Sequence, residues 1–458
     1  MMRARAALFA LVLCSPAAAQ ENNDLNRIPQ AVLNAPAAQS APVARAHGKY
    51  FLEDDLSATF VQGDLAVASP IEPSHWGNRT SLDAFDRWPL GHNIAFVFSD
   101  RFDLSEADGI GFPAGAARND LREAYLSWEP LPQTYLDFGR INLKNGIALG
   151  FNPTDFFRAR TGVSQSSADP SALRENRLGT VMVRAQTIWN GGSASFAYAP
   201  RLAGARPLAG PRPGWVDPLF DQTNCTDRFL FGLNLDLGDL STQALLFHGG
   251  SRTRLGLDLS YPIGRSVIAY GEWSGGRDTG LTARAIAFGQ ATGTLPAGAP
   301  LLPPGATARR FLSDLAVGAS WSSEAKVTLN LEYHFHQAGF SGGDWRNWFA
   351  AGAADPALAP ELWYIRAYAS DAQEPMSRQQ IFLRADWQDA PVNDLELSGI
   401  AFVNAEDGSS MVQLAADYNL DNNWTVSAYA GSDFGGAQSE WGSLPEAGSI
   451  VFQVDRYF

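Results

Sequence analysis

The chain has 458 residues, of which 45% are hydrophobic and 11% aromatic, and its formal net charge at pH 7 is -14. This acidic balance argues against a nucleic-acid partner, because a polyanion would be repelled. Beyond the N-terminus, no apolar run reaches the 18 or so residues that a helical membrane span needs. The mean hydropathy is only -0.14, so a membrane protein with this composition would have to expose alternate residues to lipid.

The N-terminus has the pattern of a secretory signal peptide over residues 1–19. Arg3 and Arg5 precede an apolar run, and three alanines end it at residue 19. Cys14 lies within this segment, so Cys225 alone remains in the mature chain and no intramolecular disulfide is available. Residues 20–46 are rich in Ala, Pro, Asn and Gln without a period, and we expect a flexible periplasmic lead-in.

From residue 47 to residue 458, strand-like segments alternate with short turns and with long polar connections, which predicts a transmembrane β-barrel. Two segments, Thr134–Asn142 and Leu240–His248, have an ambiguous phase, and the first suggests a bulge or bend at Gly139. The count is therefore about eighteen antiparallel strands, with sixteen as the alternative. The predicted strands are His47–Gln62, Arg79–Trp88, Asn93–Asp103, Leu121–Glu129, Thr134–Asn142, Thr180–Trp189, Ser193–Tyr198, Arg228–Leu237, Leu240–His248, Arg252–Tyr261, Arg265–Trp273, Phe311–Trp321, Lys326–Phe335, Gln380–Trp387, Asp394–Val403, Ser410–Leu420, Asn423–Asp433 and Ala447–Phe458.

Alternation within these segments separates an apolar face from a polar one. Over Lys326–Phe335, for example, Leu329 and Leu331 share one face, whereas Asn330 and Glu332 share the other. The polar face would line the lumen. The lumen-facing charges predicted in this way include Glu123, Arg254, Asp258, Lys326, Glu332, Arg384 and Asp386.

Aromatic residues recur where the predicted strands meet the short turns. Amphipathic rings prefer the headgroup level of a bilayer, so such a row indicates a membrane boundary. The predicted interface residues are Trp88, Trp128, Trp189, Tyr261, Trp321, Trp387, Tyr418, Trp424 and Phe458.

The last strand carries a resemblance to a known class of proteins. Ile450, Phe452 and Val454 alternate with polar residues, and the chain ends at Phe458. This end is similar to the C-terminal aromatic signal by which the outer-membrane assembly machinery recognises bacterial β-barrels, although Arg456 stands where an aromatic residue is common. The chain thus resembles bacterial outer-membrane porins, which implies an all-β barrel in the outer membrane, surrounded by lipid, with short periplasmic turns and long extracellular loops.

The segment 143–178 follows Gly139-Arg140 and resembles the inward-folded constriction loop of general porins. The candidate constriction residues in and beside it are Arg140, Asp155, Arg158, Arg160, Asp169, Arg174, Arg177 and Arg184. A ring of fixed guanidinium groups would favour anionic solutes. The alternative is that these arginines pair with Asp155, Asp169 and Glu175 and brace the loop, and the sequence leaves both open.

Other chemistry has little support, and we expect neither an enzyme nor a cofactor. His334 and His336 point the same way, but no third metal ligand follows from the spacing. No motif orients His248 and Ser251 as a hydrolase pair. In the loop Gln337–Arg378 the aromatic residues could stack on sugars, although packing within the loop, through a short helix near Glu361–Tyr368, is the favoured alternative.

The size and strand number resemble substrate-selective porins and alginate-exporter-type channels. The function that this implies is passive, substrate-biased diffusion of small hydrophilic, potentially anionic, solutes. A polysaccharide export pore is the alternative, and an outer-membrane hydrolase is a more remote one. The sequence leaves the oligomeric state open.

Overall fold

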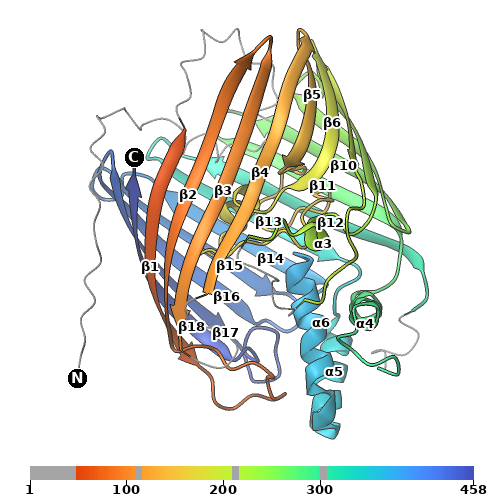
Figure 1. The fold of residues 1–458 in the computed structure, drawn as a ribbon. Coiled ribbons are helices and arrows are strands. Elements are labelled where there is room, and N and C mark those ends of the chain that lie inside the picture. Colours follow the sequence, from red (N-terminus) through yellow and green to blue (C-terminus); the bar gives the residue numbers. More distant parts are fainter. Residues whose placement is uncertain (1–47, 109–115, 209–215, 300–306) are drawn as a thin grey trace.

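The computed structural model describes residues 48–108, 116–208, 216–299 and 307–458. Within them, eighteen antiparallel strands form one sheet that closes on itself (Figure 1). Each strand pairs with its neighbours in the sequence, and β1 pairs with both β2 and β18, which closes the barrel. The strands are β1 (Lys49–Val61), β2 (Trp76–Gly91), β3 (Ile94–Ala107), β4 (Ala116–Leu131), β5 (Thr134–Ile141), β6 (Thr180–Trp189), β7 (Gly192–Ala199), β8 (Arg228–Leu237), β9 (Leu240–Gly249), β10 (Arg252–Ile263), β11 (Val267–Asp278), β12 (Arg310–Ser322), β13 (Val327–His336), β14 (Gln379–Trp387), β15 (Leu395–Asn404), β16 (Ser410–Asp421), β17 (Trp424–Phe434) and β18 (Glu446–Tyr457).

The predicted barrel of eighteen strands is confirmed, and both segments of ambiguous phase are strands. Strands β2, β3 and β4 extend beyond the predicted bounds at the ends that meet long connections. The signal peptide and the lead-in predicted from the sequence, residues 1–46, lie outside the described residues.

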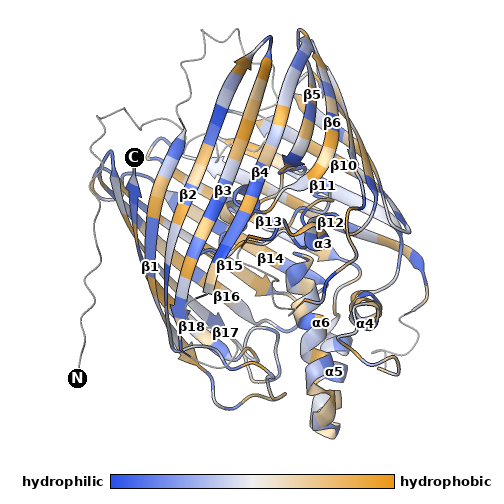
Figure 2. Ribbon diagram, viewed as in Figure 1, coloured by the Kyte–Doolittle hydropathy of each residue, from blue (hydrophilic) through white to orange (hydrophobic). Residues whose placement is uncertain are grey.

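Hydrophobic and hydrophilic residues alternate along the strands (Figure 2), and the exposure of their side chains places the apolar residues outside the barrel and the polar residues inside it. On β13, Leu331 is 54% exposed, whereas the next residue, Glu332, is fully buried. On β18, Ile450, Phe452 and Val454 are exposed on the outer face, as the sequence pattern predicts. An apolar exterior around a polar interior is the inverse of a soluble protein, and it defines a transmembrane barrel. Among the described helices, none is long and apolar enough to cross a membrane.

The aromatic residues of the predicted row lie beside the short turns, with their side chains exposed on the outside of the barrel. Trp88 stacks on Phe96 across the β2–β3 hairpin, with 5.6 Å between the ring centroids. Phe458 follows β18, and its backbone N–H donates to the carbonyl of Tyr50 at the start of β1. The row comprises Trp88, Trp128, Trp189, Tyr261, Trp321, Trp387, Tyr418 and Trp424.

The strand phase breaks at Gly139, as the sequence suggests. Phe138 faces outward, whereas Arg140, which has the same parity, is buried inside. Gly139 has a φ of +135°, and a Cβ at this position would lie 2.3 Å from the carbonyl oxygen of Ala124. Only glycine accommodates this backbone, which turns the end of β5 toward the lumen.

The long connections gather at the opposite end of the barrel from the short turns (Figure 1). Three of their helices, α4 (Leu281–Ala291), α5 (Gly342–Ala354) and α6 (Ala359–Asp371), pack together with the short helix η2 (Pro356–Leu358), and we call this group the helical cap. Its core contains Trp345, Trp348 and Phe349, together with Val67 from the β1–β2 connection. The aromatic residues of this loop therefore pack on one another, and α6 includes the predicted short helix.

Candidate functional site: the loop inside the barrel

The connection between β5 and β6, residues 142–179, contacts inward-facing side chains around most of the barrel. We call it the inner loop, and it contains one short helix, α2 (Pro170–Glu175). Asp169 caps this helix by accepting a hydrogen bond from the backbone N–H of Ser171. The inner loop comprises the segment that the sequence analysis singled out.

Two wall carboxylates hold the first part of the inner loop through its backbone. Glu272 on β11 accepts hydrogen bonds from the N–H groups of Ile147, Ala148 and Thr154, at 2.7 to 3.1 Å. Glu332 on β13 accepts from the N–H groups of Leu149 and Gly150, at 2.6 and 2.9 Å. Five backbone N–H groups of the inner loop therefore donate hydrogen bonds to two carboxylates, Glu272 and Glu332, which are buried in the barrel wall. We call this arrangement the carboxylate clamp.

Asp258 on β10 extends the clamp. The hydroxyl of Thr154 lies 3.0 Å from an oxygen of Asp258 and 2.8 Å from one of Glu272. Gly146 has a φ of +89°, and a Cβ at this position would meet the Glu272 carboxylate at 2.4 Å. The loop backbone can therefore approach the wall this closely because no side chain intervenes.

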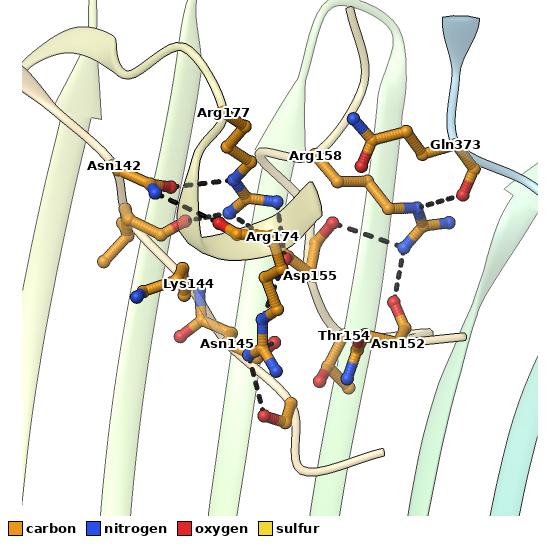
Figure 3. A network of polar contacts seen from close by, with 12 residues as sticks. Asn142, Lys144, Asn145, Asn152, Thr154, Asp155, Arg158, Arg174, Arg177 and Gln373 are labelled. Carbon is orange, nitrogen blue, oxygen red and sulfur yellow. Dashed lines mark hydrogen bonds and ion pairs between the residues drawn. The ribbon is translucent and has the colours of Figure 1, made fainter. Parts of the chain in front are cut away.

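Within the inner loop, Asp155 organises the arginines (Figure 3). Arg177 donates to both oxygens of Asp155, at 2.7 and 3.1 Å, and to the carbonyl of Leu143. Arg174 lies 3.6 Å from Asp155 and donates to the carbonyls of Asn145 and Gly146. Arg177 and Asp155 are both buried, so this bidentate pair is shielded from solvent.

Arg158 and Arg160 link the inner loop to the end of α6. Arg158 donates to the carbonyls of Asn152 and Gln373, and its guanidinium lies 4.9 Å from the ring centroid of Phe151. Burial lowers the pKa of Arg158, against the opposing fields of Glu374 and Asp155. Arg160 forms an ion pair of 3.1 Å with Asp371.

The neighbouring Glu374 connects the same region to α4 and β13. It receives two hydrogen bonds from Arg284 on α4, at 2.9 and 2.6 Å, and lies 3.6 Å from His336 on β13. Burial favours the neutral carboxyl, but the Arg284 guanidinium outweighs it and holds the pKa of Glu374 below its usual range. Glu374 is therefore the charged link between the inner loop region and the helical cap.

The second half of the inner loop reaches the remaining walls. Ser166 donates to Asp55 on β1 and accepts from Arg79 on β2. Asp169 forms an ion pair of 2.6 Å with Arg384 on β14. Gln413 on β16 accepts a hydrogen bond from the backbone N–H of Ala168. The inner loop thus spans the interior instead of lying along one wall.

The wall formed by β1 to β4 carries alternating acidic and basic side chains that the sequence analysis did not single out. Arg101 bonds to Glu53 at 2.5 Å and to Asp103 at 2.9 Å, and Arg122 donates to Asp83 at 2.7 Å. Arg79 pairs with Glu53 and Asp55. These residues alternate within the predicted strands, so the same parity rule that selected Asp258 could have selected them.

The other predicted site residues occupy several different positions. Arg140 donates to the carbonyl of Pro218, near helix α3 (Phe220–Thr223), and Arg184 lies 3.7 Å from Asp137. Arg254 and Asp314 form an ion pair of 2.5 Å, and Arg384 bonds to Asp386 at 2.8 Å. Glu123 accepts a hydrogen bond of 2.9 Å from the backbone N–H of Asn142.

Lys326 is a correction to the predicted lumen-facing set. It lies in the β12–β13 turn with a φ of +59°, and its exposed side chain pairs with Asp389 in the next turn. The strand begins at Val327, so the parity rule was extended one residue too far.

The three histidines considered for catalysis or metal binding have other partners. His334 bonds to Glu332 at 2.7 Å, and His336 bonds to Asp314 at 2.8 Å. His248 bonds to Thr253. In the part of the chain that the structure describes, no three His, Cys, Asp or Glu side chains form a group that could hold a metal ion.

The class of fold is therefore a closed, eighteen-stranded transmembrane barrel with a loop folded into its interior. No family model matches the sequence, and no curated protein matches it. Among solved structures, OccK11 (OpdR) of Pseudomonas aeruginosa has a TM-score of 0.50 and 11% identity, over 90% of this chain and 95% of its own. OccK8 (OprE) of the same organism has a TM-score of 0.50 and 12% identity, over 90% and 97%. At these identities the similarity shows the barrel fold, and the resemblance to alginate exporters stays a prediction.

Proposed function

We propose that this protein is a bacterial outer-membrane channel for the passive diffusion of small hydrophilic solutes. The observation that carries the proposal is a transmembrane barrel whose interior is lined by charged side chains and crossed by a fixed loop. A charged interior hydrates readily and disfavours apolar solutes, and a clamped loop narrows the passage reproducibly.

The solute bias that we propose depends on the candidate constriction residues Arg140, Arg158, Arg160, Arg174, Arg177 and Arg184, with Asp155 and Asp169. Most of these guanidiniums are engaged by carboxylates or carbonyls, which supports a bracing role. Of this set, Arg184 on β6 is one of the more accessible, with 27% of its side chain exposed. Arg118 on β4, which the sequence analysis did not select, has the same exposed fraction. We propose that a carboxylate-bearing solute would contact these two, because arginine binds carboxylates in a bidentate manner.

Most aromatic residues of the helical cap are buried, and Trp363 is partly buried against them, which gives the polysaccharide export pore little support. The aromatic residues on which sugar rings would stack, Trp345, Trp348 and Phe349, are buried in its core. Diffusion of small solutes is therefore the better supported function.

The test is single-channel recording from the purified, folded protein in planar bilayers. We expect discrete conductance steps, and a reversal potential in a salt gradient that gives the sign of the ion preference. Protein unfolded by heat before addition is the control. Folded protein that inserts without conducting would overturn the channel proposal, whereas a clear cation preference would overturn only the anionic bias.

The accessible arginines supply a second readout. Arg184→Gln should reduce permeation of a small carboxylate in liposome swelling assays more than permeation of a neutral solute of similar size. Arg265→Gln, in the exposed β10–β11 turn, is the matched control.

A further inference from the structure

The core of the helical cap joins connections that leave the barrel on several sides. Val67 of the β1–β2 connection belongs to this core, and Leu208 of the β7–β8 connection packs against it. The helices themselves come from the β11–β12 and β13–β14 connections. Arg366 of α6 adds the β17–β18 connection, because it donates hydrogen bonds to the carbonyl of Glu440 and to the hydroxyl of Ser443. No half of the closed sheet lacks one of these connections, so the core that they share lies across the mouth between them.

The cap also contacts the inner loop directly, through residues 158–161 of the loop and residues 371–373 at the end of α6. We call this contact the joint. The backbone N–H of Arg160 donates to the carbonyl of Asp371 at 2.7 Å, and the Arg160 guanidinium donates to the Asp371 carboxylate at 3.1 Å. The same guanidinium lies 4.9 Å from the ring centroid of Phe288 on α4. Arg160 of the inner loop therefore contacts two helices of the cap.

The joint reaches both limbs of the inner loop. The Arg158 guanidinium donates to the carbonyl of Gln373 at 3.0 Å (Figure 3). The Gln373 amide in turn donates to the hydroxyl of Thr161 at 3.3 Å. Thr161 is fully buried, and its carbonyl accepts a hydrogen bond of 2.8 Å from the backbone N–H of Leu178, near the end of the inner loop. A displacement of the joint would therefore move the outgoing and the returning limb of the loop together.

Both sides of the joint contain a residue in the left-handed backbone region. Arg160 has a φ of +64°, and Gln373 has a φ of +51° just after α6, at a position where helices commonly have a glycine. In each place, a side chain that contributes to the joint stands where glycine would avoid the strain. The contact across the joint therefore takes precedence over the local backbone preference, and strain kept in this way is typical of a functional contact.

We infer that the helical cap and the inner loop form one gate, in which a displacement of the cap at the mouth changes the width of the constriction through the joint. This inference rests on the proposed function, because a gate requires a channel. A packed core transmits a displacement instead of absorbing it, so the cap shifts as a body. The carboxylate clamp holds residues 147–154 against the wall, and the movement would act on the part of the inner loop beyond them.

A disulfide that fixes the cap tests this coupling. A Cβ at Gly352 on α5 would lie 2.5 Å from a methyl carbon of Val67, so cysteines at these two positions are close enough to form a disulfide. In a Cys225→Ser background, Val67→Cys combined with Gly352→Cys locks α5 to the β1–β2 connection when oxidised, and dithiothreitol releases it. We expect the reduced channel to alternate between conductance levels in planar bilayers, and oxidation to abolish most of these transitions. Gly352→Cys alone in the same background is the control, and it should not respond to the oxidant.

A variant of the joint separates a coupled gate from a simple lid. Arg160→Gly combined with Gln373→Gly removes the side-chain contacts and the strain of the joint, and it leaves the residues of the cap core in place. In this variant the locked cap should no longer suppress the transitions, because the inner loop no longer follows the cap. His92→Gly combined with Asn93→Gly is the matched control, since both residues have a positive φ in the exposed β2–β3 turn at the other end of the barrel. The lock should act on this control as it acts on the protein with an intact joint.

The recordings distinguish failure of this inference from failure of the proposed function. Equal suppression with and without the joint would overturn the inference, because the cap would then act as a lid alone. A lock that changes neither protein, or a wild-type channel with a single conductance level, would also overturn it and leave the proposed function intact. Folded protein that inserts without conducting would overturn the proposed function instead. Heat-modifiable gel migration shows which variants are folded, and Asp371→Asn, which removes only the ion pair of the joint, is a milder variant that should weaken the effect of the lock.

Discussion

Gly139 shows how a single residue directs a strand into the inner loop. Its positive φ and its contact with the Ala124 carbonyl leave no room for a side chain. We expect Gly139→Ala to lower the free energy of unfolding by about 2 kcal/mol or more, because the variant combines strain with a clash. Gly264→Ala is the control, since Gly264 has a φ of +67° in an open turn with nothing within 4 Å. Urea unfolding in lipid vesicles, followed by tryptophan fluorescence, would measure both, and equal effects would contradict this account.

The ion-pair partners of the arginines in the inner loop could not be predicted from the identity of the residues. The sequence allowed both a basic constriction and a set of braced ion pairs. In the structure Arg177 pairs with Asp155, twenty-two residues earlier, and Arg160 pairs with Asp371 on another connection. Partners this distant follow from the path of the chain, which neither composition nor spacing encodes.

At the scale of elements, the carboxylate clamp fixes the inner loop through backbone groups. We expect Glu272→Gln combined with Glu332→Gln to loosen the loop, because a neutral amide oxygen accepts more weakly than a carboxylate and the amide nitrogen cannot accept. The expected result is larger and noisier single-channel conductance in planar bilayers. Glu324→Gln, in the exposed β12–β13 turn, should leave the recordings unchanged. Wild-type conductance and noise in the double variant would show that other contacts suffice.

The helical cap is a second element, and its attachment to the barrel should depend on pH. Glu440, in the β17–β18 connection, accepts a hydrogen bond from the hydroxyl of Ser377. Burial raises the pKa of Glu440 to about 7, against that hydrogen bond and the field of Arg366. The Glu440 carboxyl therefore binds its proton more tightly in the folded protein than in the unfolded chain, where the pKa of this side chain is near 4.5. The contribution of the protonated Glu440 carboxyl to the stability of the folded protein is complete below about pH 4.5 and is lost as the pH rises through 7.

We accordingly expect the cap to resist proteolysis better at pH 5.5 than at pH 8. Glu440→Gln mimics the protonated carboxyl and should abolish this difference, whereas Glu324→Gln should retain it. Cleavage rates at the two pH values, corrected for protease activity on an unfolded substrate, provide the measurement. Faster cleavage at the lower pH would contradict the assignment.

At the scale of the whole molecule, the stability of the barrel in a membrane depends on the apolar character of its outward-facing side chains. Leu331 lies in the middle of the outward series of β13. Leu331→Arg should destabilise the folded barrel in lipid vesicles by about 2–4 kcal/mol, because a charge at the bilayer midplane is costly. Leu90→Arg, beside the β2–β3 turn, should cost no more than about 1 kcal/mol. Unfolding titrations of the two variants that superimpose would argue that this face does not meet lipid.

The amino-acid sequence by itself determined the barrel, a count of about eighteen strands with sixteen as the alternative, and the side of most strands that faces outward; the structure fixed the count at eighteen. These are local properties, since a strand in a barrel repeats every two residues and turns have their own residue types. Even the phase break at Gly139 could be detected from the parity of Phe138 and Arg140. The error at Lys326 was also local, a strand boundary displaced by one residue.

Only the tertiary structure decided which charges meet. Closure of the sheet places β10 to β14 within reach of a loop that leaves β5, and this gives Glu272, Glu332 and Arg384 their partners. Such contacts join residues far apart along the chain, and a pattern that repeats every two residues carries no information about them.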